Sequence, residues 1–95
     1  MSAYIVARVA IHDRAVYDRY ASQFMRVLGR YDGRLLVSDE WPEAMEGEWG
    51  GRKLVVLSFA DRAAALTWAG SPEYQEIARD RIAGADVISV LAQGF

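Results

Sequence analysis

The chain has 95 residues, a net charge of −2 and no cysteine. This length suits a single domain spanning residues 1–95, and the missing cysteines exclude disulfides, thiolate nucleophiles and cysteine-ligated metals. The 11 basic and 13 acidic residues form no basic stripe, so we expect no nucleic-acid partner. No apolar stretch approaches the roughly 18 residues of a membrane span, and no signal peptide is evident. We therefore expect a cytoplasmic protein with no membrane partner.

The first half of the chain predicts a strand, a helix and a second strand. Residues 4–11 are rich in β-branched side chains and contain no Gly or Pro. Asp13 is the predicted N-cap of a helix whose apolar residues recur at helical spacing and which ends at Gly29. Asp32-Gly33 is a turn signal, and residues 34–39 form the second strand.

The second half predicts two strands separated by two helices. Residues 53–59 form the third strand, and Asp61 caps a short helix after it. Ser71 is the N-cap of the next helix, with Pro72 at its first position, and residues 86–92 form the fourth strand. The order βαββαβ predicts the ferredoxin-like α+β fold, a four-stranded antiparallel sheet with helices on one face.

Both faces of the predicted strands are apolar. In the first strand, Ile5, Ala7 and Val9 share one face, whereas Tyr4 and Val6 share the other. Helices on one side would leave the second face as an exposed apolar patch, which monomers rarely tolerate. We therefore expect a homodimer joined through that sheet face, with a standard interface of about 800 Å² per partner. The alternative is that these strand residues are merely half-exposed.

A long loop joins the second and third strands. Residues 40–52 (EWPEAMEGEWGGR) form a connection of 13 residues, whereas hairpin loops usually have 2–5. Trp41 and Trp49 argue against disorder because each can bury a large apolar area. The loop is therefore either a lid over a pocket or an arm that reaches the other subunit. Its four glutamates match no calcium-loop pattern, so we predict no metal.

Few residues offer recognisable chemistry. His12, the only histidine, sits at a predicted helix start, where a solvent-exposed role is favoured over that of a general base. Arg8 interrupts an apolar strand and could bind an anionic substrate or cross the dimer interface to a carboxylate. No catalytic triad, phosphate-binding glycine loop or zinc signature is present, so any catalysis would be cofactor-independent.

Several stretches resemble a known family. YDGRLLV, MEGEW and RKLVVLSFADRAAALTWAGSPEYQ, followed by Arg79 and Arg81, resemble the domain-of-unknown-function family 1330, within the dimeric α+β barrel group. The family usually reads Gly-Gly-Arg where this chain has residues 32–34, and often Arg-Gly-Gly where it has residues 38–40. The resemblance implies the fold, the dimer and a ligand between helices and sheet, as in cofactor-free monooxygenases, lactone isomerases and haem-degrading relatives. It implies no particular reaction.

Two functional hypotheses follow. The first is an enzyme or binder for a small, anionic organic molecule, held between helices and sheet under the tryptophan-rich loop. Its pocket would be lined by Arg34, Trp49, Tyr74 and Arg81, with Arg34 holding the anionic group and Tyr74 donating a hydrogen bond. The second is a non-enzymatic dimer, either a ligand sensor or an assembly module, in which the loop packs into the partner and no polar groups converge on a void.

Overall fold

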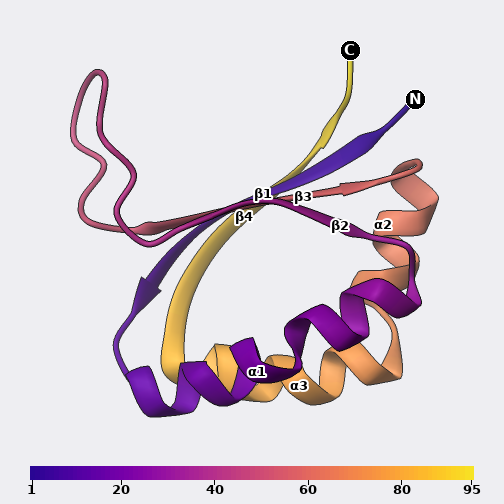
Figure 1. The fold of residues 1–95 in the computed structure, drawn as a ribbon, viewed down its shortest axis with the longest axis horizontal. Coiled ribbons are helices and arrows are strands. Elements are labelled where there is room, and N and C mark those ends of the chain that lie inside the picture. Colours follow the sequence, from indigo (N-terminus) through magenta and orange to yellow (C-terminus); the bar gives the residue numbers. More distant parts are fainter.

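The computed structural model describes all 95 residues and has the predicted ferredoxin-like α+β fold (Figure 1). Its four strands form one antiparallel sheet in the order β2-β3-β1-β4. An additional short helix, α2, precedes the second long helix, as the sequence predicts. The elements are β1 (Ala3–Ile11), α1 (Arg14–Arg30), β2 (Arg34–Asp39), β3 (Lys53–Phe59), α2 (Arg62–Ala69), α3 (Pro72–Gly84) and β4 (Ala85–Gln93).

All three helices begin at their predicted caps. The side chains of Asp13, Asp61 and Ser71 each accept a hydrogen bond from the backbone N–H three residues later. These bonds satisfy donors that the first helical turn leaves without partners. Pro72 occupies the first turn of α3, where its missing N–H costs nothing.

The end of α1 differs from the prediction. Gly29 lies inside the helix, which continues to Arg30, and the residue with positive φ is Asp32, at 57°. Gly33 then donates a backbone hydrogen bond to the Leu28 carbonyl at 3.1 Å. Aspartate tolerates the left-handed region better than most residues. The chain can therefore turn with Asp32, rather than a glycine, at the position of positive φ. Gly33 is needed for space instead, because a Cβ at this position would clash with the side chains of Leu28 and Phe59.

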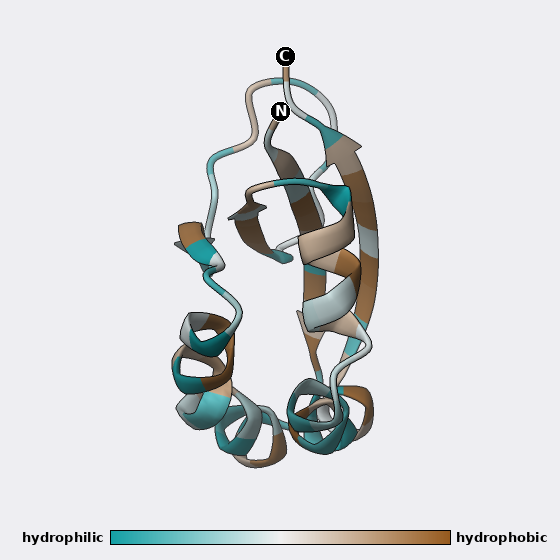
Figure 2. Ribbon diagram, turned by 90° about the vertical axis from the view of Figure 1, so that its right-hand side faces the viewer, coloured by the Kyte–Doolittle hydropathy of each residue, from teal (hydrophilic) through white to brown (hydrophobic).

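The helices cover one face of the sheet, here called the inner face. Its side chains include Ile5 and Val9 of β1 and Leu57 and Phe59 of β3, which join the main apolar cluster. α1 and α3 lie side by side beneath the sheet, and α2 lies at one end (Figure 1). In Figure 2 the strands are largely brown, whereas the helices carry hydrophilic residues over much of their surface. The helices therefore separate core from solvent on this side only.

No helix covers the opposite side, here called the open face. Its centre is the valine row, in which Val37, Val56, Val6 and Val90 pair in turn across all four strands. Val90 is 57% exposed and neighbouring Ile88 is 62% exposed. The chain exposes 6200 Å², more than the roughly 5,500 Å² expected for a monomer of this mass. The excess fits a chain with one uncovered sheet face.

The loop between β2 and β3, here called the arm (residues 40–52), projects beyond the sheet on the side away from the helices (Figure 1). Trp41 and Met45 are 78% and 89% exposed. The arm is therefore no lid over the helix-covered side of this chain. No helix combines the length and the apolar character needed to span a bilayer.

Candidate functional site

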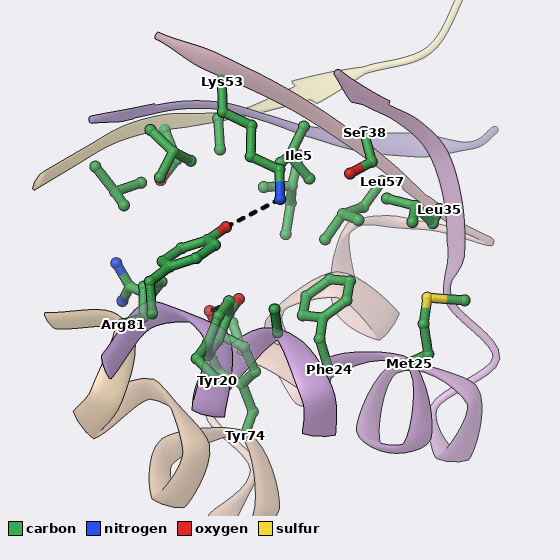
Figure 3. A pocket seen from close by; sticks show the side chains of 18 of the residues that line it. Ile5, Tyr20, Phe24, Met25, Leu35, Ser38, Lys53, Leu57, Tyr74 and Arg81 are labelled. Atoms are coloured by element: carbon green, nitrogen blue, oxygen red, sulfur yellow. Dashed lines mark hydrogen bonds between the residues drawn. The ribbon is translucent and has the colours of Figure 1, made fainter. Parts of the chain in front are cut away.

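A cavity of about 370 Å³ lies between the inner face and helices α1 and α3. It exists because α1 packs mainly against α3 and stands off from the strands. Fifteen of its 20 lining residues are hydrophobic, which suits an organic ligand. Figure 3 shows its walls: Ile5, Leu35 and Leu57 from the sheet, Tyr20, Phe24 and Met25 from α1, and Tyr74 and Arg81 from α3.

Three tyrosines bring hydroxyl groups to this apolar cavity. Tyr17 and Tyr20 come from α1 and Tyr74 from α3, and the hydroxyls of Tyr20 and Tyr74 are hydrogen-bonded at 3.1 Å. Burial raises the pKa of both Tyr17 and Tyr20 above the usual tyrosine value. Both therefore stay protonated at neutral pH and can donate hydrogen bonds to a ligand.

Lys53 places an ammonium group in the same cavity. It begins β3, and strand alternation puts it on the inner face with Val55 and Leu57. Its Nζ lies 3.4 Å from the Tyr17 hydroxyl, the contact drawn as a dashed line in Figure 3, and 5.1 Å from the Tyr17 ring centroid. Burial lowers the pKa of Lys53, because the apolar surroundings disfavour its charged form.

Two further donors line the cavity without partners. Arg81 lines the cavity in a partly buried position, and its buried Nε makes no hydrogen bond. Its neighbour Asp80 is engaged by Arg19 at 3.1 Å, and Arg81 itself forms no salt bridge. The buried indole Nε1 of Trp68 is also unpaired. Unpaired buried donors are costly, so a ligand that accepts hydrogen bonds would stabilise this arrangement.

An ion pair beside Lys53 joins the start of α1 to the end of β2. Arg14 donates two hydrogen bonds to Glu40, at 2.8 and 2.9 Å. These bonds lower the pKa of Glu40 and raise that of Arg14. Glu40 is thereby committed to Arg14 and makes no salt bridge to Lys53.

The structure separates the four predicted pocket residues into two pairs. Tyr74 and Arg81 line the cavity. Arg34 does not, because it pairs with Ser58 on the open face. Trp49 does not either: its indole donates to the Arg52 carbonyl, and its ring lies 5.9 Å from the Arg8 guanidinium carbon. The assignment of Arg34 and Trp49 to one pocket with Tyr74 is therefore corrected, since the two pairs lie on opposite sides of the sheet.

The polar lining residues that the sequence analysis does not predict are Tyr17, Tyr20, Ser38, Lys53, Gln75 and Ser89. Tyr17 and Tyr20 fall on the helical repeat of apolar residues in α1, so their spacing alone does not distinguish them from core residues. Lys53 carried a usable signal, because it precedes Val55, Leu57 and Phe59 at strand spacing and is the only lysine in the chain. His12, by contrast, is exposed, 3.8 Å from Asp86, and does not line the cavity. No group of three or more histidine or acidic side chains is arranged to hold a metal ion.

The model of the domain-of-unknown-function family DUF1330 matches residues 2–95. The chain belongs to this family. No functionally curated protein matches it.

Solved structures of the same fold cover almost the whole chain. A protein of unknown function from Rhodopseudomonas palustris has 14% identity and a TM-score of 0.82, covering 99% of this chain and 82% of its own. SnoaB, a cofactor-independent oxygenase from Streptomyces nogalater, has 14% identity and a TM-score of 0.71, with coverages of 99% and 93%. A dimeric ferredoxin-like protein of unknown function from Jannaschia sp. has 16% identity and a TM-score of 0.70, with coverages of 99% and 100%. At these identities the likeness shows the fold alone.

Proposed function

We propose that this member of DUF1330 binds a small, mostly apolar organic molecule with an anionic group, in the cavity between the sheet and helices α1 and α3. The observation that carries the proposal is that Lys53 and Arg81 both line a cavity whose other lining residues are apolar or uncharged. Neither cation has a carboxylate partner within salt-bridge distance. A bound anion would supply that partner in surroundings that strengthen the interaction.

This cavity favours a binder or enzyme over a module used only for assembly. The assembly hypothesis predicts that no polar groups surround a void. The lining of this cavity instead includes two cations and three tyrosine hydroxyls, from Tyr17, Tyr20, Lys53, Tyr74 and Arg81, besides Ser38, Gln75 and Ser89. SnoaB, with the same fold, is a cofactor-independent oxygenase. That likeness supports a role in which the chain's own side chains act on an organic molecule without a cofactor.

A pair of fluorescent probes tests the charge preference. Anilinonaphthalene sulfonate and its uncharged analogue phenyl-naphthylamine share an apolar body and differ in the sulfonate. We expect the sulfonate probe to bind more tightly, and Arg81→Met to weaken it about 10- to 100-fold, the value of a charge-assisted hydrogen bond. The uncharged probe should lose little affinity.

Arg79→Met is the matched control, because Arg79 lies on the same helix with a side chain 76% exposed. It should leave both affinities unchanged. Equal binding of the two probes, or equal effects of the Arg79 and Arg81 substitutions, would contradict the proposal.

We also propose that two copies join through their open faces, in the reducing cytoplasm that a cysteine-free chain permits. The valine row supplies a continuous apolar centre, and Trp41 and Met45 of the arm are exposed where a partner could cover them. The related Jannaschia protein is dimeric, which supports the same arrangement here. Sedimentation equilibrium should give twice the monomer mass of 10.6 kDa. A monomer at micromolar concentration would contradict it.

A further inference from the structure

Lys53 is the only lysine of the chain, although Lys and Arg together number 11. Lysine and arginine differ most where the side chain is buried, because only lysine shifts its pKa readily there. An arginine stays charged, whereas a lysine can lose its proton and become a nucleophilic amine. The one lysine therefore occupies the position where that difference has a chemical consequence.

The contacts of Lys53 leave its amine free to react. Its Nζ touches a phenol, the Tyr17 hydroxyl at 3.4 Å, and no carboxylate. The nearby Glu40 is held by two hydrogen bonds from Arg14. The remaining lining near the start of β3 is apolar or hydroxylic, and includes Val55 and Ser38. No salt bridge has to be broken before the amine meets a ligand.

The surroundings of Lys53 make its amine easier to deprotonate than a solvated lysine. Burial lowers the pKa of Lys53, and the charge of Arg14 lowers it further, whereas Glu40 and Asp18 act in the opposite direction. Tyr17, buried beside it, has a raised pKa and keeps its phenolic proton. An uncharged amine next to a protonated phenol is the pair that carbonyl condensation needs, one as nucleophile and the other as general acid.

We propose that Lys53 forms an imine with an aldehyde or ketone group of the ligand, a step that rests on the ligand binding proposed above. The amine nitrogen attacks the carbonyl carbon, and a proton moves from nitrogen to oxygen to give a carbinolamine. Tyr17 donates its proton to the departing hydroxyl, which leaves as water while the nitrogen lone pair forms the C=N bond. The remaining N–H proton returns to the Tyr17 oxygen. Arg81 holds the anionic end of the ligand, and the apolar walls limit hydrolysis of the imine.

Reductive trapping tests this step directly. The intact protein is treated with carboxybenzaldehyde and cyanoborohydride, and the adducts are located by mass spectrometry of peptides. We expect a single adduct at Lys53, formed about tenfold or more faster than at the α-amine of Met1. Tyr17→Phe keeps the aromatic ring and should slow the labelling about tenfold or more by removing the general acid.

A relocated lysine provides the matched control. Arg79→Lys in a Lys53→Arg background places one exposed lysine on the surface and should label only at the slow rate of a solvated amine. Circular dichroism verifies that each variant is folded. If wild-type Lys53 labels only at that slow rate, the proposal is overturned. The Met1 α-amine of the wild-type protein gives a second reference rate, which does not depend on the folding of any variant.

The 4-methylbenzoate anion separates this inference from the proposed function, because it has the carboxylate and the ring of carboxybenzaldehyde but no aldehyde group. If it displaces anilinonaphthalene sulfonate while Lys53 labels no faster than the relocated lysine, imine formation is overturned and ligand binding stands. If neither compound displaces the probe and Lys53 is not labelled, both proposals are overturned. Displacement by both compounds with rapid labelling at Lys53 supports both.

Discussion

The two faces of the sheet are built from similar apolar residues but have different surroundings. On the inner face Leu57 is 2% exposed, because helices lie over it. On the open face Val90, also on a strand, is 57% exposed. Strand alternation makes both faces hydrophobic and cannot distinguish a folding core from an interface. What covers each face decides that, and here the helices cover only one.

The polar residues of the two faces differ as well. On the inner side, Lys53, Arg81 and three tyrosines line one cavity. On the open side, Arg8 lies against the Trp49 ring at the base of the arm. A ligand site needs polar groups directed at a space, whereas an interface needs a broad apolar surface with its charges paired. This difference supports the proposed ligand site on the inner face and the proposed dimer interface on the open face.

The largest expected effect comes from a charge at the centre of the valine row. Val6→Lys would bury an unpaired ammonium in each half of the proposed interface, at a cost of about 3–5 kcal/mol. The dimer dissociation constant should rise at least about 100-fold, as measured by sedimentation equilibrium. Binding of anilinonaphthalene sulfonate to the inner cavity should persist and shows that the variant is folded. Ala63→Lys, at an exposed position of α2, is the control. If both variants dimerise equally, the open face is not the dimer interface.

Leucine-to-alanine substitutions on the two faces of β3 test which face belongs to the folding core. Leu57→Ala should lower the free energy of unfolding by about 2–5 kcal/mol, because it leaves a cavity under the helices. Leu54→Ala, on the open face of the same strand, should cost less than about 1 kcal/mol in a dissociated Val6→Lys background. Urea denaturation of both variants in that background gives the two values. Similar losses would mean that the two faces are equally buried in the monomer.

Two glycines close to the end of α1 test the packing of the inner face. A Cβ at Gly33 would collide with Leu28 and lie 2.7 Å from Phe59, so Gly33→Ala should cost about 1–3 kcal/mol. A Cβ at Gly29 meets nothing within 4 Å, so Gly29→Ala should be neutral or stabilising by about 0.5–1 kcal/mol. Thermal unfolding compares the pair. Two equal shifts would show that Gly33 is not a packing constraint.

The smallest expected effect concerns the ion pair between α1 and β2. Hydrogen bonding to Arg14 lowers the pKa of Glu40, so the pair stabilises the fold above about pH 4 and is lost as the pH falls through the lowered pKa. Glu40→Gln should reduce the melting temperature slightly at pH 7, and the difference from wild type should vanish in acid. Glu43→Gln, on the exposed arm, should have no effect at either pH. A difference that persists at low pH would contradict an ionic origin.

Local signals predicted most of the secondary structure. Asp13, Asp61 and Ser71 each satisfy a helix N-terminus through their own side chain, so the caps could be read without tertiary information. Gly29 was misread as a helix end because glycine preference is only statistical, and Asp32 provides the reversal here. Tyr74 and Arg81 were correctly placed on a helix, but which helix face met a cavity depended on the distance between α1 and the sheet.

The sequence by itself determined the faces of β1, β3 and β4, the helix starts and the presence of a long connection after β2, because each depends on residues within a few positions of one another. Only the tertiary structure decided that a bulge between Leu35 and Val37 turns Ser38 inward and leaves Val37 on the open face. Only it brought Lys53, Tyr17 and Arg81, from three separate elements, to one cavity. Those juxtapositions depend on how far the helices stand from the sheet, and that spacing is set by packing across the whole domain.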